Sequence, residues 1–228
     1  MVKRKGKLQQ GVLPFRQRGG ARKGAGRKPK GEKAGVSHRV REAVSARYPV
    51  HVTVRLVQGL PNLRRRPVER VLRASFVKAC ERAGFRLTHY SVQGNHLHLI
   101  CEAVDRTALA RGMQGLLIRV AKALNKLWGR SGTVFADRYH HRVLKTPRQV
   151  RNALCYVLNN ARKHGLRIDS DVADPFSSGD VFYGWDRMPH VELGETSLGL
   201  VAKARTWLLN VGWRRHGLIP LLAVPRAA

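Results

Sequence analysis

The chain has 228 residues, of which 44 are Lys or Arg and 14 are Asp or Glu, so its formal charge is +30 at pH 7. This length fits one compact domain with tails and leaves no room for two large domains. The charge favours nucleic acid over a membrane as the partner, because each phosphate contact releases condensed counterions. No apolar stretch approaches the roughly 20 residues that a membrane-spanning helix needs.

The N-terminus and the cysteines indicate the compartment. The N-terminus is basic and has no apolar core segment, so it does not resemble a secretory signal. Three cysteines without paired spacing (Cys80, Cys101 and Cys155) favour free thiols in a reducing compartment over a disulfide framework or a zinc site. We therefore expect a cytoplasmic protein.

Residues 1–47 are rich in Gly, Lys and Arg, with 15 basic and two acidic residues and no apolar periodicity. This composition predicts a disordered basic tail. From Val50 to Leu56 apolar and polar residues alternate, which predicts a half-buried strand. Apolar residues then recur at three- and four-residue spacing from Val68 to Cys80, which predicts an amphipathic helix that stops at Gly84.

Two β-prone runs, residues 85–92 and 96–101, flank the turn-forming residues Gln93-Gly94-Asn95 and predict a hairpin. A long helix should follow, capped by Asp105 or Thr107 and extending to Trp128. Residues 133–144 are expected to be extended.

The last clear helix has a strong start signal, in which Thr146 is the N-cap, Pro147 takes the first helical position and Gln149 completes a capping box. It should run to about His164 and stop at Gly165. A short helix with a basic aromatic end is expected within residues 206–217.

This element order predicts an α+β fold, a ferredoxin-like split βαβ sandwich with helices on one face of an antiparallel sheet and an added C-terminal helix. The expected division is a tail at residues 1–47, a catalytic domain at 48–166 and a basic, aromatic extension at 167–228.

His96 and His98 are two residues apart in a predicted strand, so both side chains point to one face while Leu97 and Leu99 point to the other. Two neighbouring imidazoles can chelate one divalent ion. A His-x-His pair is also common as ordinary surface or core histidines. The motif therefore needs a third ligand before it indicates a metal site.

The last predicted helix carries Tyr156 and Asn160 four residues apart, away from its apolar stripe. The amide of Asn160 can complete a metal site, and Tyr156 can act as a nucleophile, although a tyrosine on a polar face can also lack any role. The competing nucleophiles are Tyr90, Tyr139 and Tyr183. We favour Tyr156 because a rigid helix positions a nucleophile better than a strand end or loop does.

The segments Gly94-Asn95-His96-Leu97-His98-Leu99 and Tyr156-Val157-Leu158-Asn159-Asn160 resemble the motifs of HUH single-strand tyrosine transposases. Residues 51–165, about half the chain, resemble the REP-associated (RAYT) branch of this IS200-like family, in which Asn stands four residues after Tyr. Asn160 is followed by Ala161 where many relatives have Pro.

The resemblance implies a DNA transposase, an endonuclease that cuts and rejoins single-stranded, hairpin-forming DNA. Tyr156 would attack a phosphate and form a 5′-phosphotyrosine link. His96, His98 and Asn160 would hold a divalent metal, Mg²⁺ or Mn²⁺, although imidazole ligands alone lean toward later transition metals. Relatives occur as monomers and as dimers, so a homodimer is compatible with the resemblance.

Basic and aromatic residues near this region are candidate DNA contacts. The basic ones are also compatible with an ordinary solvated surface. Trp207 could stack on DNA in the same way or equally belong to the core. The candidates are Arg138, Arg142, Lys145, Arg148, Arg151, Arg162, Lys163, Trp213, Arg214 and Arg215.

Two other functions fit the sequence. The first is a non-catalytic RNA- or DNA-binding protein on the same scaffold, but such sheets use exposed aromatic residues and this one offers few. The second is a domesticated relative that cleaves repeated hairpins without transposing itself.

Overall fold

The computed structural model describes residues 42–190 and 199–225, so most of the predicted tail, up to residue 41, lies outside the described residues. The elements in chain order are β1 (Val50–Arg55), α1 (Arg66–Val77), β2 (Glu81–Arg82), β3 (Phe85–Val92), β4 (His96–Ala103), α2 (Arg106–Leu127), β5 (His140–Val143), α3 (Pro147–Leu158), α4 (Asn160–Lys163), the 3-10 helix η1 (Ser178–Val181), α5 (Trp207–Asn210) and the 3-10 helix η2 (Gly212–His216).

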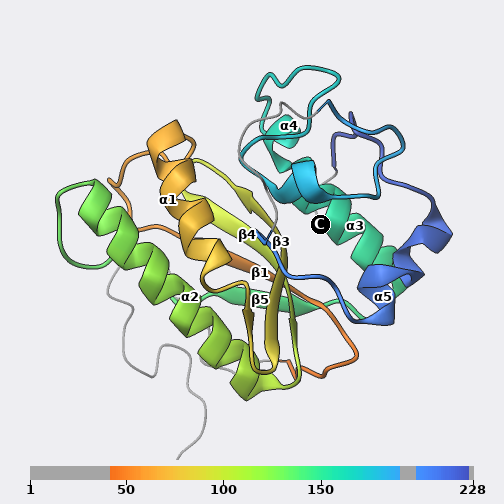
Figure 1. Ribbon diagram of the computed structural model, residues 1–228, viewed down its shortest axis with the longest axis horizontal. Coiled ribbons are helices and arrows are strands. Elements are labelled where there is room, and N and C mark those ends of the chain that lie inside the picture. Colours follow the sequence, from red (N-terminus) through yellow and green to blue (C-terminus); the bar gives the residue numbers. More distant parts are fainter. Residues whose placement is uncertain (1–41, 191–198, 226–228) are drawn as a thin grey trace, which may run out of the picture. The chain divides into compact units, whose positions relative to one another are not determined.

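The sheet has the strand order β2-β3-β4-β1-β5, and every neighbouring pair is antiparallel (Figure 1). The order β3-β4-β1-β5, with α1 between β1 and β3 and α2 between β4 and β5, is that of a ferredoxin-like split βαβ unit. The predicted fold class is therefore confirmed. The short strand β2 is an addition at one edge.

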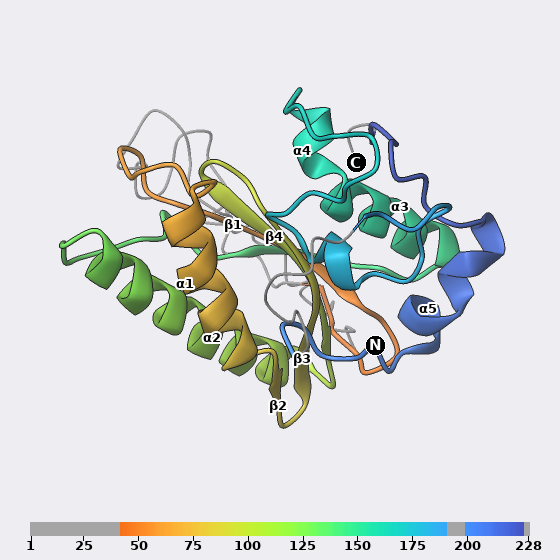
Figure 2. The same cartoon turned by 45° about the horizontal axis from the view of Figure 1, so that its top comes forward.

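The two faces of the sheet belong to two different cores. Helices α1 and α2 cover one face, where Leu97, Leu99 and Cys101 of β4 are buried, and α3 lies on the other side (Figure 2). Ile100 of the same strand belongs to the core that contains Leu154 and other residues of α3. Because side chains alternate along a strand, the even-numbered residues of β4 face α3.

Helix α1 ends at Val77, earlier than the predicted stop at Gly84. Between these two positions lies the two-residue strand β2, in which Glu81 and Arg82 pair with the start of β3. Gly84 has φ +75° and a Cβ there would lie 2.9 Å from Val104 Cγ2, so this glycine serves a hairpin turn and not a helix end.

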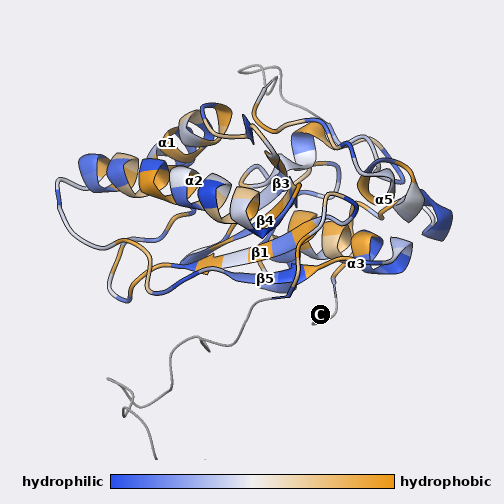
Figure 3. Ribbon diagram, turned by 90° about the horizontal axis from the view of Figure 1, so that it is seen from below, coloured by the Kyte–Doolittle hydropathy of each residue, from blue (hydrophilic) through white to orange (hydrophobic). Residues whose placement is uncertain are grey.

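Helix α2 begins where the sequence predicts. Asp105 is the N-cap and accepts a hydrogen bond from the backbone N–H of Ala108, so Thr107 is not the cap. Figure 3 shows hydrophilic and hydrophobic residues alternating around α1 and α2, as expected of helices with one buried face. The extended stretch predicted at 133–144 contains only one strand, β5, and Phe135 makes a single bridge with Leu56.

Helix α3 has the predicted capping box. The side chain of Thr146 accepts a hydrogen bond from the backbone N–H of Gln149, and the side chain of Gln149 accepts one from the backbone N–H of Thr146. The helix does not run unbroken to His164. It ends at Leu158 and α4 begins at Asn160. At the break, the side chain of Asn159 is buried and donates to Pro220 O at 3.2 Å. The predicted stop at Gly165 is present, with φ +71°.

The predicted C-terminal helix is divided into α5 and η2. The start of α5 is attached to β4, because the buried carboxylate of Glu102 accepts hydrogen bonds from the backbone N–H groups of Arg205 and Thr206. The strand that carries the two histidines thus also holds this extension. Within the described ranges, no helix is long and apolar enough to cross a membrane.

Candidate active site

The side chains of the candidate site come from two paired strands and one helix. In the β1–β4 ladder Thr53 lies opposite His98, and Arg55 lies opposite His96. Strand β1 buries Val50, Val52 and Val54 on the α1–α2 side, so its alternate residues face α3. The strand pairing therefore places polar side chains of β1 beside both histidines.

The two histidines point toward each other, with His96 Nε2 and His98 Nε2 3.1 Å apart. His96 Nδ1 lies 2.8 Å from Asn95 Oδ1, and His98 Nδ1 lies 3.1 Å from Thr53 Oγ1 and 3.3 Å from His51 Nε2. Donation from each Nδ1–H to these oxygens leaves both Nε2 lone pairs directed at one point, since the hydrogen bond at one ring nitrogen sets the state of the other.

Both histidines are held neutral. Burial, with Arg55 and His164 nearby, lowers the pKa of His96 to about 4. Burial, with His51 and His96 beside it, lowers the pKa of His98 to about 2. Neutral imidazole is the form that binds metal ions, so at pH 7 both rings are competent ligands.

Tyr156 lies against His98 and His51. Its ring centroid is 5.1 Å from that of His98 and 5.9 Å from that of His51, in edge-to-face arrangements. The ammonium group of Lys163 lies 4.6 Å from the centroid of the Tyr156 ring. A cation in this position stabilises negative charge that develops on the phenol.

The competing tyrosines are in different surroundings. Tyr90 and Tyr139 are buried in the core between the sheet and α1–α2, and burial raises the pKa of Tyr90. Tyr183 is 76% exposed in the loop after η1. Tyr156 is the tyrosine whose ring contacts a histidine of the His-x-His motif.

Asn160 follows Tyr156 by one helical turn and is fully buried. The sequence placed it on a polar face away from the apolar stripe, but this face of the helix is turned into the protein. Neither Oδ1 nor Nδ2 of Asn160 has a hydrogen-bond partner among the described residues. A buried amide without partners costs free energy, so this side chain is suited to bind a group supplied from outside.

The donor set fits a divalent ion. Two nitrogens bound at right angles to one ion at about 2.1 Å lie roughly 3.0 Å apart, close to the spacing of the two Nε2 atoms, whereas a tetrahedral site would set roughly 3.4 Å. In residues 42–190 and 199–225 no group of three or more His, Cys, Asp or Glu side chains could hold a metal ion. An amide oxygen, such as that of Asn160, is a further type of ligand for a divalent ion.

A hollow of about 230 Å³ lies beside Tyr156. Its walls come from β1, from β5 and the residue after it, and from α3. The lining residues are His51, Arg142, Leu144, Gln149, Asn152, Ala153 and Tyr156.

Several of the basic residues predicted to contact DNA make contacts within the protein. Lys145 Nζ lies 2.6 Å from Glu42 Oε1. Arg151 donates to Gly217 O and Leu218 O, and Arg162 donates to the backbone oxygens of Ile168, Asp169 and Val172. These arginines hold the loops that follow α4 and η2, and a role in DNA contact stays a prediction for them.

Trp213, the aromatic residue of the C-terminal extension that was predicted to contact DNA, is buried. Trp213 is 1% exposed and its Nε1 donates to Leu209 O, because η2 packs against α3, so a stacking role for this indole is wrong. Its neighbour Arg214 lies over the Trp213 ring. Arg215 lies 4.8 Å from the ring centroid of Trp207, which is 49% exposed.

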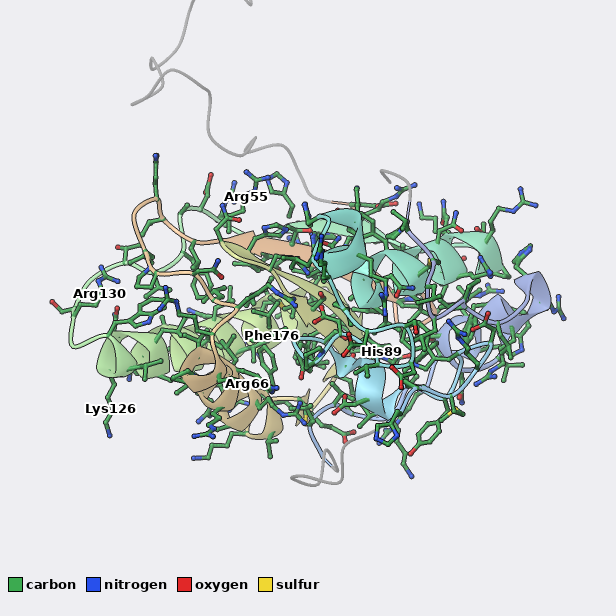
Figure 4. The ribbon with its side chains drawn as sticks, turned by 90° about the horizontal axis from the view of Figure 1, so that it is seen from above. Arg55, Arg66, His89, Lys126, Arg130 and Phe176 are labelled. Carbon is green, nitrogen blue, oxygen red and sulfur yellow. The ribbon has the colours of Figure 1, made fainter. Side chains whose placement is uncertain are left out.

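Four of the predicted DNA-contact residues remain candidates by position. Arg142 lines the hollow, Lys163 covers Tyr156, and Arg148 is exposed at the start of α3. Arg138 precedes β5, and its backbone N–H donates to Asp137 Oδ1. Figure 4 shows Arg55, a further basic residue, at the end of β1.

Sequence reasoning missed the residues that surround the histidines, namely His51, Thr53, Arg55 and His164. The first three occupy the polar positions of the alternation in β1, which is the signal that they share a face. His164 lies four residues after Asn160, and its ring centroid is 6.2 Å from that of His96. Helical spacing could have placed it beside the site.

No family model matches the sequence, and no curated protein matches it. Among solved structures, a REP-associated tyrosine transposase bound to a REP hairpin aligns over 75% of this chain and 100% of its own, at 18% identity and a TM-score of 0.54. This chain has the fold of a REP-associated tyrosine transposase. At this identity the likeness to that transposase concerns the fold alone.

A second similar structure is a candidate transposase from Deinococcus radiodurans. It aligns over 48% of this chain and 85% of its own, at 12% identity and a TM-score of 0.37.

Proposed function

We propose that this protein is a metal-dependent tyrosine transposase that cuts and rejoins single-stranded DNA. The observation that carries the proposal is the contact between Tyr156 and the neutral imidazole of His98, whose Nε2 lies 3.1 Å from that of His96. A nucleophile beside a preformed pair of metal ligands suits transfer of a phosphoryl group. The transposase fold and the charge of +30 agree with DNA as the substrate.

The reaction would be a transesterification at Tyr156. The phenol oxygen forms a bond to phosphorus, the bond from phosphorus to the 3′-oxygen breaks, the phenol loses its proton, and the 3′-oxygen gains one. The ammonium of Lys163 would stabilise the developing phenolate. The covalent link to Tyr156 conserves the energy of the cleaved bond, so a free 3′-hydroxyl can restore the DNA without a nucleotide cofactor.

His96, His98 and Asn160 would hold the ion, and Thr53 and Asn95 would orient the two imidazoles. Mg²⁺ or Mn²⁺ bound there would polarise the scissile phosphate and offset charge on the leaving oxygen. The exposed basic residues around the site would bind the phosphates on either side.

The DNA is proposed to be a single strand that can form a hairpin, because the similar transposase was solved with a REP hairpin bound. The domain covering residues 48–166 would catalyse the reaction, with residues 1–47 and 167–228 as the tail and the extension.

Purified protein, Mn²⁺ or Mg²⁺ and labelled single-stranded hairpin DNA should give a covalent protein–DNA adduct that survives denaturant. Tyr156→Phe should abolish the adduct. Tyr183→Phe, which changes an exposed tyrosine in the loop after η1, should retain it. An adduct that persists in Tyr156→Phe would refute the choice of nucleophile.

His96→Ala and His98→Ala should each abolish cleavage and leave salt-sensitive DNA binding in place. Absence of cutting on every hairpin tested, with binding intact, would favour the alternative of a non-catalytic binding protein. Cutting without movement of the gene itself in cells would identify a domesticated nuclease.

A further inference from the structure

Apart from Tyr156, the residues that line the hollow have no part in the transesterification itself. Neither His96 nor His98 lines it, and its volume of about 230 Å³ is set by residues of β1, β5 and α3. Sites for drug-sized molecules measure roughly 300–1,000 Å³. The hollow beside Tyr156 is smaller than these sites and is suited to one flat ring system.

The lining combines an apolar base with a polar rim. Leu144, Ala153 and the Tyr156 ring supply the apolar surface, while Arg142, Gln149 and Asn152 supply polar groups. An apolar surface with a few placed polar groups is how proteins hold a nucleobase that has left its stack.

Hydrogen-bond donors dominate the rim. Gln149 Oε1 accepts from the backbone N–H groups of Lys145 at 2.7 Å and Thr146 at 3.2 Å. These two bonds fix the side-chain amide, so its NH₂ group is the end that is left to bind a ligand. Arg142 also lines the hollow, and its guanidinium adds further donors.

We propose that this hollow binds the base of a nucleotide next to the phosphate that Tyr156 attacks, and that it selects a purine, with guanine the best match. Guanine presents two acceptors, O6 and N7, on the edge that arginine binds with two parallel hydrogen bonds, and amide side chains pair with the N6 and N7 of adenine. Pyrimidines lack such an edge. The inference depends on the proposed function, because it takes Tyr156 as the nucleophile.

The first test measures the cutting rate of a mapped hairpin substrate in which each base flanking the scissile phosphate is replaced by the other three. At one flanking position, guanine should be cut roughly tenfold or more faster than either pyrimidine, the size expected of one specific base contact. Asn152→Ala, at an exposed position of α3, should reduce this preference, and Arg142→Ala should abolish it.

Arg148→Ala is the matched control, because Arg148 is exposed on the same helix and does not line the hollow. Loss of a phosphate contact should slow cutting of all four bases equally and keep their ratio. If Asn152→Ala and Arg142→Ala also slow all four bases equally, the proposal is overturned.

A second test separates the hollow from the chemistry by using Tyr156→Phe protein, which cannot form the adduct. Oligonucleotides with 2-aminopurine at successive positions should show quenching at one position, and Arg142→Ala in the same background should reverse it. Quenching there supports the base site even if no DNA is ever cut. Equal signals at all positions, or competition by inorganic phosphate alone, would overturn it.

Discussion

The hydroxyl group of Thr53 orients the imidazole of His98. Thr53 Oγ1 lies 3.1 Å from His98 Nδ1, on the side of the ring away from His96. Partners of this kind fix the ring and its tautomer, and their loss typically weakens metal binding by about 10–100-fold. Thr53→Val should therefore raise the dissociation constant for Mn²⁺ within that range in a calorimetric titration.

Thr53→Ser keeps the hydroxyl and should bind Mn²⁺ as the wild type does. Because binding is measured without DNA, the result does not depend on cutting. Wild-type affinity in Thr53→Val would show that the hydroxyl does not position the ring.

Lys163 acts on Tyr156 through charge, with its ammonium 4.6 Å from the ring centroid. A cation over an aromatic face is worth about 0.5–2 kcal/mol, and about 1.4 kcal/mol corresponds to a tenfold change in rate. Lys163→Met keeps most of the aliphatic stem and should slow adduct formation roughly tenfold in single-turnover assays. Lys163→Arg should recover most of the rate, whereas equal slowing in both variants would argue against a charge effect.

At the scale of elements, α3 depends on its capping box. Thr146 Oγ1 accepts from Gln149 N at 3.2 Å, and the Gln149 side chain accepts from Thr146 N in return. Replacing such a cap with alanine costs about 1 kcal/mol. Thr146→Ala should lower the free energy of unfolding by that amount in urea titrations.

Thr107→Ala is the control, since Thr107 is exposed at the start of α2 but Asp105 caps that helix. Its effect should stay within about 0.5 kcal/mol, as for ordinary surface changes. A similar loss in both variants would mean that the box contributes nothing specific.

The elements that the sequence predicted correctly are those with local signals. The alternation of β1, the β3–β4 hairpin and the caps of α2 and α3 are each set within a few residues. Strand β2 was missed although its partners are close in sequence, because two residues are too few to show an alternation. Other differences involve distant residues. At the break after α3, the side chain of Asn159 bonds to Pro220, 61 residues away. The burial of Trp213 depends on packing against α3.

The residues of the site also fall into two groups, those that a local sequence motif identifies and those whose contacts depend on distant parts of the chain. His96, His98 and Tyr156 belong to short motifs, so their types and spacing could be found in the sequence. The contact of His51 with His98 comes from strand pairing across 47 residues, and its register is not visible in either strand alone. The burial of Asn160 likewise depends on which side of α3 and α4 meets the sheet.

At the scale of the whole molecule, buried neutral histidines link stability to pH. His89 is enclosed between β3 and η1, where its ring meets Phe182 and its Nδ1 lies 3.3 Å from Ser178 Oγ. Burial lowers the pKa of His89 to about 4 from an ordinary value of 6.5. Figure 4 shows His89 close to the part of the chain that contains η1.

Between these two pKa values the unfolded chain binds a proton at His89 that the folded protein does not. Stability therefore rises with pH in this window, is fully present above about pH 6.5, and is lost as the pH falls toward 4. The contribution of this one residue is at most about 3.5 kcal/mol, given about 1.4 kcal/mol for each unit of pKa difference. His51, with its pKa also lowered to about 4 by burial, adds to the same slope.

His89→Gln should accordingly flatten the dependence of the urea midpoint on pH between 4 and 6.5, whatever it does to stability at pH 7. His140→Gln, which removes an exposed imidazole of β5, is the control for loss of a histidine as such. The measurement is made without metal, so that ligation at His96 and His98 does not enter. If His89→Gln keeps the wild-type slope, then His89 takes up its proton in the folded state, and acid sensitivity must come from the histidines of the site.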